Sequence, residues 1–148
     1  TILSMAQLTI EALVAAELLS RYCNIECEVI DLRVVKPLDF KTIKKSLLKT
    51  KNLLCLENSF EDGSISSDII AKVAIDKNIH LKNKPSLIAM PNVPVPSTYD
   101  ASRIFYTRHI NIIKKILSIF NRKNLIPKNL LKISNPHDIP GSWFKGPF

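Results

Sequence analysis

The amino-acid sequence predicts an α/β fold, a three-layer α/β/α sandwich around a mostly parallel sheet of about five strands, one of them antiparallel. Two observations lead to this prediction. Short apolar segments typical of strands alternate with longer segments in which apolar residues recur at helical spacing. The chain has 148 residues, of which 46% are hydrophobic and 23% charged, the balance of a globular domain with a core of its own.

Eight segments alternate between the two patterns. Strands are expected at residues 2–4, 26–32, 52–57 and 86–90, and helices at residues 5–22, 40–50, 64–76 and 108–120. The first helix is rich in Ala and Leu, with Gln7, Glu11 and Arg21 marking its wetter face, so we expect it to lie buried against the sheet. A polar loop is expected at residues 58–63 and a Pro-rich segment at 91–96.

Residues 29–39, which read Val-Ile-Asp-Leu-Arg-Val-Val-Lys-Pro-Leu-Asp, are the most informative part of the chain. Val29, Ile30 and Leu32 form an apolar run typical of a strand that is buried on both faces. Pro37 lacks a backbone donor, so the strand cannot continue through it. The run therefore predicts a strand, its exit and the start of a helix.

The exit from this strand carries charged side chains. Asp39 is placed to cap the following helix, whose apolar stripe is Phe40, Ile43, Leu47 and Leu48. Arg33 and Lys36 follow the strand at the edge where open α/β sheets usually place their sites. For Arg33, a local ion pair with Asp31 or Asp39 is as well supported as a role at an interface.

No self-sufficient active site is expected. The only glycines are Gly63, Gly141 and Gly146, which excludes a Gly-x-Gly-x-x-Gly dinucleotide loop and a Gly-rich phosphate loop. The serines lack a nucleophile-elbow context, and His80, His109 and His137 are not at metal-ligand spacing. Glu57, Glu61 and Asp62 could act as acid and base, although a solvated loop is the simpler interpretation. We therefore predict no catalytic, cofactor-binding or metal-binding residues.

The cysteines indicate a reducing compartment. Cys23, Cys27 and Cys55 are odd in number and lack a second close pair, so neither a disulfide scaffold nor a zinc site is expected. Cytoplasm and an organelle matrix both fit. No apolar stretch is long enough to span a membrane, and no signal peptide opens the chain. The sequence begins at Thr1, so we expect a fragment or a processed product.

The net charge of +8 is concentrated at one end. From Arg103 onward the chain carries nine Lys or Arg and one acid, Asp138, whereas twelve bases and twelve acids precede Arg103. A basic end of this kind fits either a polyanion-binding module through residues 103–132 or a solvated basic face. The solvated face is the preferred interpretation, and nucleic-acid binding is not expected.

The C-terminal residues differ in character from the α/β body. Residues 121–148 contain four prolines and end in an aromatic group formed by Trp143, Phe144 and Phe148. Terminal aromatics usually dock on a surface, here either the same domain or a partner subunit. We expect one α/β domain at residues 1–120 and a basic, aromatic-ended extension at residues 121–148.

Four parts of the chain are similar to a known family: residues 1–4 with 12–19, residues 29–39, residues 90–96, and Phe105-Tyr106 followed by Ile112-Ile113. The chain resembles the C-terminal domain of the transketolase superfamily, most closely that of the beta subunit of the first component of 2-oxoacid dehydrogenase complexes. Two departures stand out. Residues 63–66 read Gly-Ser-Ile-Ser where the family usually has Gly-Gly-x-Gly, and Asn92 replaces the usual Asp.

The resemblance implies a part of a larger enzyme. Its relatives use thiamine diphosphate and magnesium to decarboxylate a 2-oxoacid, pyruvate in particular, and pass the acyl group to a lipoyl carrier. In them the cofactor is held outside this domain, between an alpha subunit and the N-terminal domain of the beta subunit. The implied partners are the alpha subunit, a second beta subunit and the lipoyl acyltransferase core, with no membrane.

The implied role of this domain is assembly and docking. The candidate interface residues are Arg33, Lys36, Glu57, Phe60, Gly63, Asn92, Trp143, Phe144 and Phe148. A transketolase or a deoxyxylulose phosphate synthase is the alternative within the superfamily, and the non-enzymatic polyanion-binding module is the alternative from another class.

Overall fold

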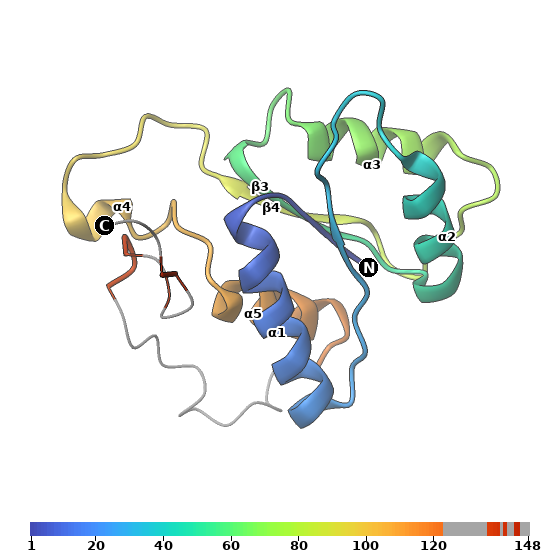
Figure 1. The fold of residues 1–148 in the computed structure, drawn as a ribbon, viewed down its shortest axis with the longest axis horizontal. Helices are drawn as coiled ribbons and strands as arrows, with labels where there is room; N and C mark the ends of the chain where they lie inside the picture. Colours follow the sequence, from blue (N-terminus) through green and yellow to red (C-terminus); the bar gives the residue numbers. More distant parts are fainter. Residues whose placement is uncertain (123–135, 140, 142–143, 146–148) are drawn as a thin grey trace.

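The computed structural model describes residues 1–122, 136–139, 141 and 144–145 (Figure 1). Its sheet consists of β1 (Ile2–Ser4), β2 (Val29–Asp31), β3 (Leu54–Phe60) and β4 (Ser86–Met90), in the order β2-β1-β3-β4. Every pairing is parallel. The expectation of about five strands, one antiparallel, is therefore wrong for the described part of the chain, which has four parallel strands.

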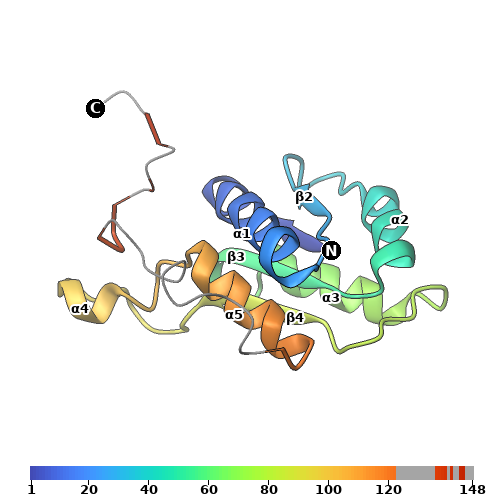
Figure 2. The same ribbon diagram turned by 90° about the horizontal axis from the view of Figure 1, so that it is seen from below.

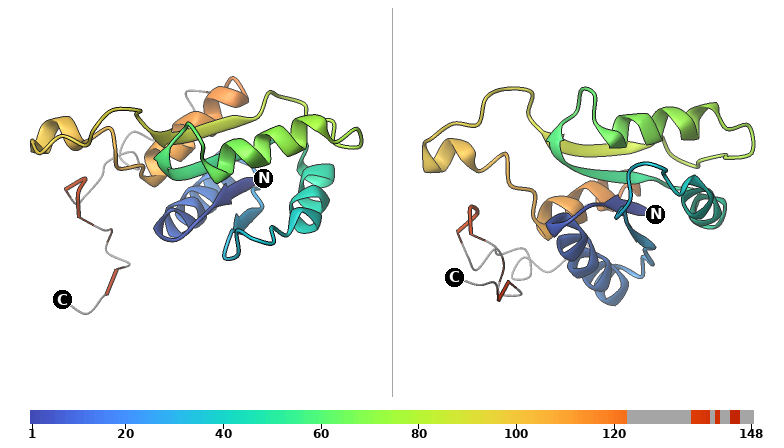
Figure 3. Two further views of the ribbon diagram at one scale, coloured as in Figure 1. Left: turned by 90° about the horizontal axis from the view of Figure 1, so that it is seen from above. Right: turned by 45° about the horizontal axis from the view of Figure 1, so that its top comes forward.

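Helices cover both faces of the sheet, which confirms the three-layer arrangement. The helices are α1 (Gln7–Cys23), α2 (Phe40–Thr50), α3 (Ile65–Ile75), α4 (Tyr99–Ser102) and α5 (His109–Ile119). Figure 2 shows α1 and α5 side by side. In Figure 1, α2 and α3 lie on the other side of the sheet from α1 and α5. The short α4 projects beyond the end of β4, away from the layers (Figure 3).

The core consists of two clusters, one on each face of the sheet. Alternate strand residues supply them, because successive side chains of a strand point to opposite faces. Ile2, Leu54 and Leu56 pack with α1 and α5, whereas Leu3 and Cys55 pack with α2 and α3. The short strands thus bind the two helical layers into one domain.

The strand β2 corrects one expectation from the sequence. It begins at Val29 and is half-buried along its length, so Val29, Ile30 and Leu32 do not form a strand buried on both faces. The physical reason is position: β2 is an edge strand, paired only with β1. Its Asp31 carboxylate accepts a hydrogen bond from Thr9 Oγ1 of α1 at 3.0 Å.

The helix α2 has the predicted bounds. The Asp39 carboxylate caps it by accepting a hydrogen bond from the Thr42 backbone N–H at 3.0 Å. Ile43 and Leu47 are buried as predicted, but Leu48 is 50% exposed. Leu48 lies one residue past the stripe, about 100° around the helix axis, and so faces water.

Two further boundaries differ from the sequence pattern. The strand β3 continues to Phe60, through the first part of the expected polar loop, because Phe60 pairs with Met90 of β4 after a register shift. The helix α4 was not predicted, since four residues are too few for a periodic signal. Within the described residues, no helix combines the length and apolar character needed to cross a bilayer.

Ile112 of α5 is fully buried in the cluster that includes α1. We expect Ile112→Ala to lower the free energy of unfolding by about 2–5 kcal/mol, because the removed side chain leaves a cavity. The measurement is urea denaturation followed by circular dichroism. Leu48→Ala is the matched control and should change the free energy by no more than about 0.5 kcal/mol. Equal losses in the two variants would contradict the assigned layers.

Candidate functional site

The loops at the carboxyl edge of the sheet carry most of the predicted interface residues. In a parallel sheet the chain leaves every strand at the same edge, so segments distant in sequence gather there. Asn92, which follows β4, donates a hydrogen bond from Nδ2 to Asp62 Oδ2 in the loop after β3, at 2.7 Å. This bond joins the two loops across the edge.

Arg33 and Lys36 lie in the segment that follows β2, and both are exposed. Arg33 Nε is 2.8 Å from Asp31 Oδ2, and its side chain is 85% exposed. This is one of the two local ion pairs that the sequence suggested. A pair so exposed contributes little to stability, so the guanidinium is available to other molecules.

Glu57 and Gly63 stabilise the start of α3 and the turn before it at this edge. The Glu57 carboxylate is buried and accepts hydrogen bonds from Ser66 Oγ at 3.0 Å and from the Ser66 backbone N–H at 3.4 Å. Ser64 caps α3 by accepting from the Ser67 N–H. Ser64 and Ser66, which stand where the family usually has glycine, therefore both take part in hydrogen bonds. Gly63 has a φ of +70°, a conformation that favours glycine.

Exposed apolar side chains lie beside these polar groups. Phe60 is 40% exposed at the end of β3. The sequence reasoning missed four further residues, although they lie in the two most informative motifs. They are Val34 and Val35 after β2, and Val93 and Val95 after β4, each at least 40% exposed. These five residues lie on three segments, which follow β2, end β3 and follow β4, and we call them together the edge patch.

Neither a metal-binding cluster nor a reactive thiol is found among the described residues. No group of three or more His, Cys, Asp or Glu side chains among them could hold a metal ion. All three cysteines are free thiols. Burial raises the pKa of Cys55 to about 12, and burial also raises the pKa values of Cys23 and Cys27, so none is a ready thiolate nucleophile.

A buried ion pair connects α1 with the start of α5. Glu11 was expected on the wetter face of α1, but it is only 4% exposed. Its Oε1 lies 3.1 Å from Arg108 Nε, and its Oε2 accepts a hydrogen bond from the His109 backbone N–H at 2.7 Å. His109 Nδ1 is 2.9 Å from the same oxygen. The expectation failed because α5 covers this face of α1.

The surroundings of Glu11 favour its charged form. Burial by itself raises the pKa of Glu11, but hydrogen bonds from the His109 side chain and backbone outweigh it, with help from the positive charge of Arg108. The pKa of Glu11 is therefore below its usual value. The carboxylate also lies at the N-terminus of α5, where the helix dipole favours a negative charge.

A serine and a histidine come together near α4. Ser102 Oγ is 2.9 Å from His137 Nε2, and both residues are buried. Ser102 Oγ also donates a hydrogen bond to the Tyr99 carbonyl at 2.8 Å, so its hydrogen is not directed at the imidazole. The pair is therefore not arranged as a nucleophile and its base. His137 belongs to residues 136–139, for which no sequence pattern predicted a contact with the α/β body.

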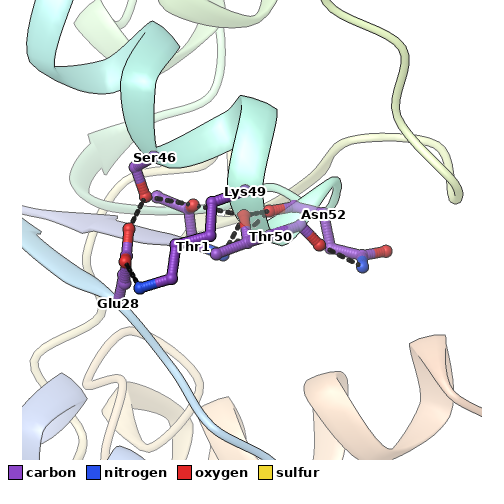
Figure 4. Close-up of polar contacts among 6 residues, drawn as sticks. All are labelled: Thr1, Glu28, Ser46, Lys49, Thr50 and Asn52. Carbon is purple, nitrogen blue, oxygen red and sulfur yellow. Dashed lines mark hydrogen bonds and ion pairs between the residues drawn. The ribbon is translucent and has the colours of Figure 1, made fainter.

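At the amino edge of the sheet, a polar cluster ties α2 to the start of β1 (Figure 4). Thr1 Oγ1 lies 2.6 Å from both Ser46 Oγ and Thr50 Oγ1. Ser46 Oγ donates to Glu28 Oε2 at 2.5 Å, and Lys49 pairs with the other oxygen of Glu28. Hydrogen bonds from Lys49 and Ser46 lower the pKa of Glu28. Every charge in this cluster has a partner, so we interpret it as structural.

The aromatic residues of the tail are only partly described. Phe144 is 41% exposed, whereas Trp143 and Phe148 lie outside the described residues. The helix α5 buries its apolar stripe and exposes Lys114, an arrangement that a solvated basic face and a polyanion-binding face would share.

The fold and the edge thus define a class, an α/β domain with a parallel sheet and an exposed edge surface. The family model described as the transketolase C-terminal domain matches residues 1–108. The chain therefore belongs to the transketolase C-terminal domain family, which confirms the resemblance found in the sequence.

Individual relatives agree with this assignment. The chain is 38% identical over 96 residues to the mitochondrial pyruvate dehydrogenase E1 component subunit beta of Chaetomium thermophilum, covering 65% of this chain and 25% of the relative. It is 36% identical over 104 residues to the mitochondrial subunit beta-1 of rice, covering 70% and 28%. The chain thus spans little more than a quarter of these relatives.

A solved structure shows the same fold. It is described as a split gene transketolase, an inactive beta4 tetramer, and it matches with a TM-score of 0.68. The match covers 83% of this chain and 39% of that chain at 19% identity.

Replacing Glu11 should make stability less dependent on pH. Glu11→Gln leaves the buried guanidinium of Arg108 without its counter-charge, so we expect a loss of about 3–5 kcal/mol in the free energy of unfolding at pH 7. The contribution of Glu11 is present above the usual glutamate pKa and is lost as the pH falls through its lowered pKa. The difference between the two proteins should therefore stay constant from pH 7 down to the usual glutamate pKa and shrink as the pH falls further.

Urea denaturation across this pH range measures the effect. Glu17→Gln is the matched control, because Glu17 is an exposed residue of the same helix. It should leave both the stability and its pH dependence nearly unchanged. A constant difference between Glu11→Gln and the parent chain at every pH would contradict the charge pairing.

Proposed function

We propose that this chain is the C-terminal assembly domain of the beta subunit of a pyruvate dehydrogenase. The activity of the whole enzyme, decarboxylation of a 2-oxoacid and transfer of the acyl group to lipoamide, is then shared with parts outside this chain. Support comes from the relatives, which are pyruvate dehydrogenase E1 beta subunits. The identity to the transketolase structure is too low to favour that branch of the superfamily.

The observation that carries the proposal is the edge patch. Five apolar side chains, each at least 40% exposed, lie at the end of β3 and on the segments that follow β2 and β4. Exposed apolar side chains with polar and charged neighbours are typical of surfaces that contact another protein. The charged Arg33 and Lys36 flank Val34 and Val35, and the polar Asn92 precedes Val93. An assembly role needs a surface of this kind and needs no catalytic residues.

The proposed partners follow from this role. They are an alpha subunit, a second beta subunit and the lipoyl acyltransferase core. Thiamine diphosphate and magnesium would be held by parts of the enzyme outside this domain, and the described residues offer no cluster that suits a metal ion. We place the enzyme in the cytoplasm or in an organelle matrix, since the relatives named above are mitochondrial and all three thiols are free.

Phe60→Ser tests the edge patch. Co-expression with the alpha subunit of the same organism, followed by sedimentation velocity, measures association. We expect at least a tenfold weaker association, about 1.4 kcal/mol, because a side chain at the centre of an interface contributes disproportionately.

Ile75→Ser is the matched control for this experiment. Ile75 is 78% exposed, but it ends α3 and lies outside the edge patch. It should leave association unchanged. Equal behaviour of the two variants would remove the support for the edge as the contact surface.

A further inference from the structure

The edge strand β2 leaves one side of its backbone unpaired within the described part of the chain. Its only neighbour in the sheet is β1. The carbonyl of Glu28 and the N–H of Leu32 both bond to β1 at 2.8 Å. Because the backbone groups of successive residues alternate between the two sides of a strand, Val29 and Asp31 direct theirs away from β1. Two N–H groups and the Val29 carbonyl therefore face the open side, where another strand could pair.

An open groove of about 640 Å³ lies between β2 and α2. The two elements lie at the same end of the domain (Figure 2). The α2 side of the groove is one face of the helix, because Thr42, Lys45 and Lys49 are spaced three and four residues apart. The β2 side consists of Val29 and Ile30, which Glu28 precedes. The groove thus combines a strand edge with a row of polar and cationic side chains.

The charge of this groove is positive. The helix α2 contains four lysines and no acid from Phe40 to Thr50. Lys45 and Lys49 line the groove and are exposed. Lys49 pairs with Glu28, the acid that lines the groove, whereas Lys45 has no ion pair among the described residues. A second copy of the chain would bring another lysine-rich α2 to this place, which repulsion between like charges disfavours.

We propose that the groove between β2 and α2 binds an extended acidic segment of another protein, which adds to the sheet as a strand beside β2. Lys45 and Lys49 are separated by about 6 Å along the helix axis. Side chains on one face of a strand repeat at about 6.6 Å, so acidic residues at positions i and i+2 of the segment match the two lysines. Backbone hydrogen bonds to Val29 and Asp31 supply the remaining affinity.

This inference does not depend on the proposed function, because the groove shares no residue with the edge patch. Its first test is an NMR titration of the isotope-labelled full chain with the peptide acetyl-Thr-Val-Asp-Val-Asp-Val-Thr-amide. We expect the amide signals of Val29 and Asp31 to shift, with a Kd of about 1 mM or tighter. The same peptide with both aspartates replaced by asparagine should bind about tenfold more weakly at low salt. Absence of these shifts at millimolar peptide, or equal binding of the two peptides, would overturn the proposal.

Reversing one charge of the groove tests the role of α2. Lys45→Glu should weaken binding of the aspartate peptide about tenfold, because attraction becomes repulsion at close range. Lys72→Glu is the matched control, since Lys72 is an exposed residue of α3 that does not line the groove. It changes the net charge by the same amount and should alter the Kd by no more than about twofold. An equal loss in the two variants would contradict recognition by the groove.

The strand pairing is tested on both partners. Val29→Pro removes the N–H that faces the open side but no hydrogen bond to β1, and an edge strand tolerates proline in this position. We expect it to lower the affinity about tenfold with an unchanged circular dichroism spectrum. Two further peptides carry N-methyl groups on the aspartates or on the valines, and only one of them should lose binding, because alternate amides face β2.

Equal binding of the two N-methylated peptides would contradict an added strand, whether or not Val29→Pro folds. Sedimentation velocity of the full chain without peptide tests the other occupant of the groove. We expect the same sedimentation for the parent chain and Lys45→Glu at micromolar concentration. A dimer of the parent chain that Lys45→Glu strengthens and Val29→Pro abolishes would assign the groove to a second copy and overturn the proposal.

Discussion

The buried ion pair of Glu11 with Arg108 is the interaction that the helical layer of α1 and α5 depends on. A parallel sheet must be covered on both faces, and here α5 completes one of the coverings. The Glu11 carboxylate accepts a hydrogen bond from the backbone N–H of His109, the first residue of α5. It also pairs with Arg108, the residue before His109. Arg108 in turn holds the carbonyl of Ile139. One charge on α1 thus organises contacts between segments about a hundred residues apart.

The charged side chains that stabilise the fold and the side chains exposed to other molecules lie in different parts of the domain. At the amino edge and at the junction of α1 and α5, charged side chains are paired within the chain. At the carboxyl edge, valines and Phe60 face solvent beside charged groups whose ion pairs are weak. A domain with this distribution can bind neighbours without doing chemistry itself. This distribution supports the proposed role in assembly.

Local signals in the sequence were sufficient for much of the fold. The bounds of α2 and β4 were predicted correctly, and the Asp39 cap explains why α2 begins where it does. Interactions between distant residues could not be predicted. The edge position of β2 depends on strand order, and the burial of Glu11 depends on a helix that begins 98 residues further along the chain. The contact between Ser102 and His137 likewise joins two segments without a shared motif. The interface roles of Arg33 and the other candidates remain predictions.

The central claim is that this chain assembles an enzyme whose cofactor is bound elsewhere. Isothermal titration calorimetry of the purified chain with thiamine diphosphate and Mg²⁺ tests it most directly. The account predicts no heat of specific binding at millimolar cofactor, because the described residues present no metal cluster and the sequence contains no Gly-rich phosphate loop. Stoichiometric binding at micromolar concentration would contradict it.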